Sequence, residues 1–133
     1  LRRIREVETR IEYPLHRATV VGKIDVILHD GEGVEIRDYK SSDLVTTQNE
    51  VAMQLRLYAR GLTMLGESVT RGSVAYLEDA SIAPVEVGSN ELRDAEGIAE
   101  RHIDGISHGI FPPCPGGACE RCDYGNICKF RRI

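Results

Sequence analysis

The chain has 133 residues, of which 41% are hydrophobic and 29% charged, and its net charge is −4. This length suits one folded domain, and the acidic balance excludes the general basic character of many nucleic-acid-binding proteins. No apolar run approaches a membrane span and no signal-peptide pattern opens the chain, so we expect a cytoplasmic protein with no membrane partner. Because the chain begins with Leu rather than Met, we expect a piece of a longer protein.

Three strands are expected first, at residues 7–15, 18–28 and 34–39. The first interleaves charged and apolar residues, the second is rich in β-branched side chains, and the third alternates apolar and polar residues. Asp30-Gly31-Glu32-Gly33 is a strong turn signal between the second and third strands. These two strands are therefore predicted to form a β-hairpin.

The hairpin brings three charged residues to neighbouring positions. Asp38 and Lys40 are two residues apart and so share one face of their strand, while Asp25 lies on the adjoining strand. Two carboxylates and an ammonium group suit a divalent metal and the charge of a phosphoryl transition state. The alternative is a hairpin whose charges simply face water.

The rest of the chain predicts a helix, two strands and a second helix. Residues 48–65 have helical apolar periodicity, with Gly66 as the C-terminal cap, and Gln54 and Tyr58 lie four apart on one helix face. Strands are expected at residues 70–77 and 82–87. A second helix runs from residue 89 or 90 to about 108, with the apolar stripe Leu92, Ala95, Ile98, Ile103 and Ile106. This order predicts an α/β fold with a mixed sheet flanked by helices.

Three motifs together resemble a known family. Gly22-x-x-Asp25, Asp38-Tyr39-Lys40 and Gln54-Leu-x-x-Tyr58 resemble the PD-(D/E)XK nucleases of the RecB type, over about residues 7–130. The resemblance implies a restriction-endonuclease-like core in residues 1–110, without the family's N-terminal helix and its histidine ligand. It implies a metal-dependent DNA exonuclease domain of a helicase-nuclease in DNA repair or recombination. The alternatives are a CRISPR-adaptation exonuclease and a catalytically inactive DNA-binding or structural module.

The resemblance also implies roles for individual residues. Asp25, Asp38 and the backbone carbonyl of Tyr39 would bind Mg²⁺ or Mn²⁺, and a water activated by the metal would attack the phosphate. Lys40 would orient this water or stabilise the developing charge. Gln54 and Tyr58 would contact DNA. The expected partners are DNA and a helicase domain or subunit.

All four cysteines lie in the tail, residues 111–133, at Cys114, Cys119, Cys122 and Cys128. Such a concentration of thiols suits Zn²⁺ or an iron–sulfur cluster. The spacing C-x2-C-D-Y-x3-C resembles the tail of the iron–sulfur members of the same family, which implies an iron–sulfur cluster, with Zn²⁺ as the alternative. In those proteins one ligand lies upstream of the nuclease core, so the fourth thiolate is either Cys114 or a residue outside this chain. A metal-binding interaction domain centred on this tail is a further alternative.

Overall fold

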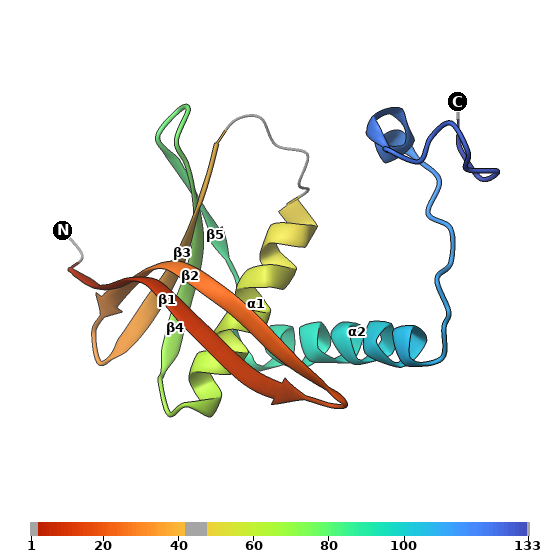
Figure 1. The fold of residues 1–133 in the computed structure, drawn as a ribbon. Helices are drawn as coiled ribbons and strands as arrows, with labels where there is room; N and C mark the ends of the chain where they lie inside the picture. The colour runs from red at the N-terminus through yellow and green to blue at the C-terminus, as the bar shows by residue number, and fades with distance from the viewer. Residues whose placement is uncertain (1–2, 42–47, 133) are drawn as a thin grey trace. The chain divides into compact units, whose positions relative to one another are not determined.

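The computed structural model describes residues 3–41 and 48–132. Its elements are β1 (Ile4–Leu15), β2 (Ala18–Asp30), β3 (Gly33–Lys40), α1 (Gln48–Met64), β4 (Val69–Tyr76), β5 (Ser81–Val85), α2 (Ser89–Ser107) and the short 3₁₀ helix η1 (Gly117–Arg121) (Figure 1). The predicted order of strands and long helices is confirmed. The chain divides into two compact units, Leu1–Ile103 and Asp104–Ile133. The division into domains after residue 110 stays a prediction.

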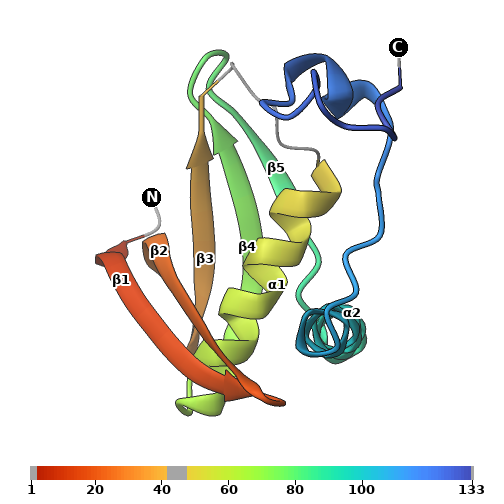
Figure 2. The ribbon, with the colours of Figure 1, turned by 45° about the vertical axis from the view of Figure 1, so that its right-hand side comes forward.

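The five strands form one mixed sheet in the order β1-β2-β3-β4-β5. Neighbouring strands are antiparallel except β3 and β4, which are parallel. Parallel neighbours need a crossover connection, and α1 supplies it by packing across one face of the sheet (Figure 2). The predicted turn between β2 and β3 is confirmed, with Gly31 in a left-handed conformation at a φ of 60°.

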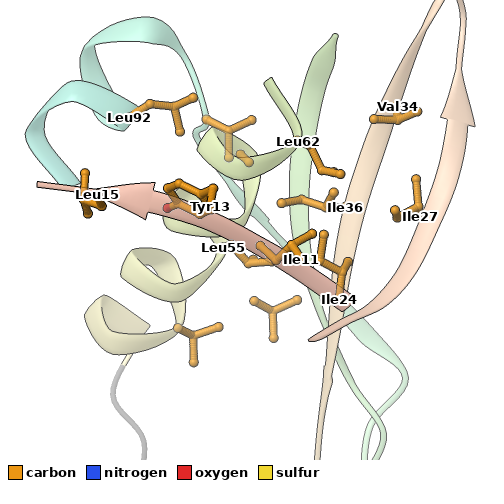
Figure 3. Packing of buried hydrophobic residues seen from close by; sticks show 14 residues of the cluster. Ile11, Tyr13, Leu15, Ile24, Ile27, Val34, Ile36, Leu55, Leu62 and Leu92 are labelled. Atoms are coloured by element: carbon orange, nitrogen blue, oxygen red, sulfur yellow. The ribbon is translucent and has the colours of Figure 1, made fainter. Parts of the chain in front are cut away.

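The core lies between the sheet and α1. Buried side chains of α1 repeat at helical spacing and meet apolar residues of β1, β2 and β3 (Figure 3). Ile36 of β3 is completely buried at the centre. The hydroxyl of Tyr13 on β1 donates a hydrogen bond to the carbonyl of Leu57 on α1 at 2.7 Å. Helix α1 ends at Met64, and Gly66 then turns the chain at a φ of 92°.

Helix α2 contributes less to the core than its apolar stripe predicted. Leu92 and Ala95 are buried and Ile103 is partly buried, but Ile98 and Ile106 are exposed. The apolar stripe thus marks core residues at Leu92, Ala95 and Ile103 but not at Ile98 and Ile106. Among the helices of residues 3–41 and 48–132, none is long and apolar enough to cross a membrane.

The core position of Leu55 gives a direct test of this packing. Leu55 is 1% exposed, whereas Leu65, just beyond the end of α1, is 67% exposed. Leu55→Ala should lower the free energy of unfolding by about 2–5 kcal/mol because it leaves a cavity. Leu65→Ala should change it by less than about 0.5 kcal/mol. Urea denaturation measures both values, and equal losses would contradict the burial of Leu55 in the core.

Candidate active site

Two carboxylates meet where β2 and β3 begin to separate. Val26 pairs with Arg37 in the antiparallel register, so the next facing positions are Asp25 and Asp38. Oδ2 of Asp25 accepts a hydrogen bond from the backbone N–H of Tyr39 at 2.9 Å. Asp25 is thereby fixed against the end of β3, at the peptide that follows Asp38.

Strand β2 is irregular at the level of Asp25. Ile24 and Ile27 both lie in the core, although a regular strand would direct them to opposite faces. At the corresponding position of β1, Glu8 has a φ of 49°, in the left-handed region that side-chain-bearing residues rarely occupy. Strand β2 therefore changes face here, and the backbone of β1 is irregular at the same level. Irregularities of this kind redirect side chains next to functional sites.

Asp38 is buried beside Lys40 on the face of β3 that also carries Ile36. The side chains of Asp38 and Lys40 are 7% and 19% exposed, and Lys40 Nζ lies 2.9 Å from Asp38 Oδ2. Apart from this ion pair, the buried oxygen has no hydrogen-bond partner among the described residues. The attraction is therefore ionic, and Oδ2 keeps acceptor capacity for a further cation.

The surroundings of Asp38 have opposing effects on its pKa. Burial raises the pKa of the Asp38 carboxyl, the Lys40 ammonium lowers it, and the Asp25 carboxylate raises it again, so that the net shift is upward. Two carboxylates in close proximity disfavour the state in which both are ionised. A divalent cation would relieve this repulsion, and carboxylate oxygens are the ligands that Mg²⁺ prefers. The donor set thus fits a hard metal ion.

Gln54 and Tyr58 form a pair on α1, as their spacing predicted. Gln54 Nε2 donates a hydrogen bond to the Tyr58 hydroxyl at 2.8 Å, and both side chains are half-buried. The ring of Tyr58 lies against Gly22 of β2. The sequence places Gly22 in the Gly-x-x-Asp motif but does not predict its contact with Tyr58, because a contact between distant segments leaves no local sequence pattern.

The cysteines of the tail are not gathered into a metal site. All four are free thiols, and among residues 3–41 and 48–132 no group of three or more His, Cys, Asp or Glu side chains could hold a metal ion. Cys119 is distinct, because backbone N–H groups of Arg132 and Gly116 donate to its sulfur at 3.5 and 3.4 Å. These bonds lower the pKa of the Cys119 thiol. The environment of Cys119 thus favours its thiolate, and the metal centre expected for the tail, with Cys114 or a ligand outside this chain as the fourth, stays a prediction.

A second polar cluster lies on the opposite face of the sheet. Glu35 is 2% exposed and accepts hydrogen bonds from Arg37 at 2.7 Å and Ser73 at 3.1 Å. A hollow of about 740 Å³ opens on this face. Because odd-numbered residues of β3 face away from Asp38, this hollow is separate from the carboxylate pair. The strand's alternating pattern gave no indication that Glu35 is buried.

A mixed sheet that brings two carboxylates and a lysine together in adjacent strands is the framework of a nuclease-type α/β protein. The chain belongs to the PD-(D/E)XK nuclease superfamily, whose family model matches residues 2–129. The five-stranded sheet and the two α-helices of the described residues are consistent with the restriction-endonuclease-like fold. No curated protein matches the chain.

Two solved structures share the fold. SSO0001 is 20% identical with a TM-score of 0.62, over 96% of this chain and 61% of that one. A protein from Eubacterium rectale named "Putative exonuclease" is 17% identical with a TM-score of 0.57, over 96% of this chain and 53% of that one. The chain thus spans less than two thirds of either neighbour, and at these identities the likeness concerns the fold alone.

The raised pKa of Asp38 leads to a prediction on stability. The Asp38 carboxyl holds its proton more tightly in the folded state than in the unfolded state. The free energy of unfolding of the metal-free protein should therefore fall as pH rises through the raised pKa. Mg²⁺ competes with that proton, so the stabilisation by Mg²⁺ should grow over the same range. It should reach about 2.7 kcal/mol at a free concentration one hundred times the dissociation constant.

Thermal melting with and without Mg²⁺, at pH values from the ordinary aspartate pKa of 3.8 upward, measures this stabilisation. Asp38→Asn should abolish the response to Mg²⁺. An equal response in the parent and in Asp38→Asn would exclude Asp38 as a ligand.

Proposed function

We propose that this chain is the catalytic domain of a DNA nuclease that hydrolyses phosphodiester bonds with Mg²⁺ or Mn²⁺. In this reaction the oxygen of water bonds to phosphorus, and the bond from phosphorus to the leaving sugar oxygen breaks. The observation that carries the proposal is the buried Asp38, whose open Oδ2 lies beside Lys40 and whose carboxyl interacts with that of Asp25. Membership of the nuclease superfamily supports it.

We assign metal binding to the two carboxylates and charge stabilisation to the lysine. Asp25 and Asp38 would hold the cation, with the backbone carbonyl of Tyr39 as a further ligand. When bound, the cation supplies Lewis-acid chemistry, activating water and neutralising phosphate charge. Lys40, already held by its ion pair with Asp38, stabilises the negative charge that grows on the phosphate oxygens.

Gln54 and Tyr58 are proposed to contact DNA. The Tyr58 hydroxyl accepts the hydrogen bond of Gln54 and so keeps its own proton to donate. A phosphate oxygen is a fitting acceptor, because phosphate contacts fix the register of a nucleic acid without reading its sequence. This pair would therefore place the strand over the carboxylates irrespective of base sequence.

We further propose that the whole protein is an exonuclease that works with a helicase domain or subunit in DNA repair or recombination, in the cytoplasm. The RecB-type motifs support this proposal, as does the structural neighbour named an exonuclease. A CRISPR-adaptation exonuclease is the alternative within the same chemistry. An inactive DNA-binding or structural module is the alternative outside it, and the joint retention of Asp25, Asp38 and Lys40 argues against that role.

For the tail we propose a soft metal centre bound by Cys119, Cys122 and Cys128. Cys114 or a ligand outside this chain would be the fourth. The spacing of these cysteines and the thiolate-favouring environment of Cys119 support the proposal. We propose an iron–sulfur cluster, with Zn²⁺ as the alternative. Because the thiols are not gathered in the described structure, binding requires the tail to rearrange.

Cleavage of labelled DNA tests the catalytic proposal. Asp38→Asn should lower the rate with Mg²⁺ by at least about a hundredfold, because a lost ligand costs several kcal/mol of barrier. Asp94→Asn, an isosteric change at an exposed position of α2, is the matched control and should cut like the parent. Equal rates for Asp38→Asn and the parent would exclude the mechanism.

Metal analysis of protein purified without oxygen tests the tail. Iron, inorganic sulfide and a broad visible absorption are expected, and Cys122→Ser should lose all three. Asp38→Asn should keep them, since the carboxylate site is a separate centre. Colourless protein with one equivalent of zinc would decide for Zn²⁺, and protein free of both metals would exclude either centre.

A further inference from the structure

We propose that Gly22 is a positioning residue: its missing side chain sets the place of Tyr58 and, through Tyr58, of Gln54. This inference rests on the proposed function, in which that pair contacts DNA. Gly22 lies on β2 three residues before Asp25, so the strand that carries a metal ligand also carries the support for the DNA-contacting helix face.

The contact between Gly22 and Tyr58 leaves no room for a side chain. A Cβ atom built on Gly22 would lie 2.8 Å from Tyr58 Cζ and 3.0 Å from the Tyr58 hydroxyl oxygen. Carbon atoms that are not bonded pack at about 3.5–4.0 Å, so even an alanine would push the ring away. The contact involves the end of the ring, where the hydroxyl is attached.

The backbone does not explain the glycine. The glycines with a positive φ in the described chain are Gly31, Gly66 and Gly109, and Gly22 is not among them. An L-residue could therefore adopt its strand conformation without strain. Glycine is needed here because the Tyr58 ring occupies the space that a side chain at residue 22 would fill.

Displacement of the ring would carry over to Gln54. The hydrogen bond between Gln54 Nε2 and the Tyr58 hydroxyl is 2.8 Å long and joins side chains one helical turn apart. Tyr58 also packs against the core cluster, which restricts the positions to which the ring could move. A methyl group at residue 22 would move the hydroxyl that the pair shares, and both DNA contacts would shift together.

Gly61 offers a matched control for general damage to packing. It lies on the same helix, and a Cβ atom there would lie 2.7 Å from Cδ1 and 2.8 Å from Cε1 of the Tyr13 ring. Gly61→Ala therefore forces a methyl group against an aromatic ring in the same interface of sheet and helix. Neither Gly61 nor Tyr13 takes part in the bond between Gln54 and Tyr58.

The experiment measures the dissociation constant for a fluorescein-labelled oligonucleotide, single-stranded and duplex, with Ca²⁺ in place of Mg²⁺ so that binding is separated from cleavage. Gly22→Ala is measured in the parent and in Tyr58→Leu, whose side chain lacks the ring atoms that would clash. We expect Gly22→Ala to weaken binding by about tenfold or more in the parent, the size of one lost hydrogen bond to a charged group. In Tyr58→Leu the same change should cost less than about twofold.

Each outcome either supports the assignment of Gly22 as a positioning residue or overturns it. Gly61→Ala should lower the melting temperature while leaving the DNA dissociation constant near that of the parent. Equal losses from Gly22→Ala in both backgrounds, or a similar loss from Gly61→Ala, would overturn the assignment of Gly22. If Gly22→Ala alone does not fold, the double variant must fold and bind like Tyr58→Leu, and an unfolded double variant overturns it too. A parent that does not bind DNA at all overturns the proposed function instead.

Discussion

The ion pair between Asp38 and Lys40 is the constraint on which the site depends. A buried carboxylate is costly unless a positive charge accompanies it, and Lys40 supplies that charge from the same face of β3. Asp25 adds a second negative charge from the adjoining strand, which one ammonium group cannot balance. The site is therefore built with a deficit of positive charge, and this deficit is what favours a divalent cation.

Much of the fold could be predicted from the sequence, because the signals are local. Gly31 marks the turn between β2 and β3, and Gly66 marks the end of α1, each with the positive φ that favours glycine. The alternation of residues along β3 placed Asp38 and Lys40 on one face, and the turn placed Asp25 beside them. Each of these features depends on residues close together in the chain, and the local sequence therefore predicts it.

The remaining features depend on contacts between distant residues. Glu35 reads as a surface residue of β3, but Arg37 and Ser73 enclose it. Ile106 fits the apolar stripe of α2 and is nevertheless 61% exposed, whereas Ile103 of the same stripe packs against the core. The roles assigned to the site residues stay predictions, as does the metal centre of the tail. For the cysteines, spacing alone did not settle whether four sulfur atoms converge.

The polar clusters on both faces of β3 bear on how this sequence can vary. Ile36 and Asp38 are buried on one face, and Glu35 is buried on the other. A substitution on this central strand therefore disturbs either the core or a charged network, whichever way its side chain points. Substitutions should be tolerated more easily on the edge strand β5, none of whose residues is buried. Among divergent descendants of this chain, β3 should be the segment that changes most slowly.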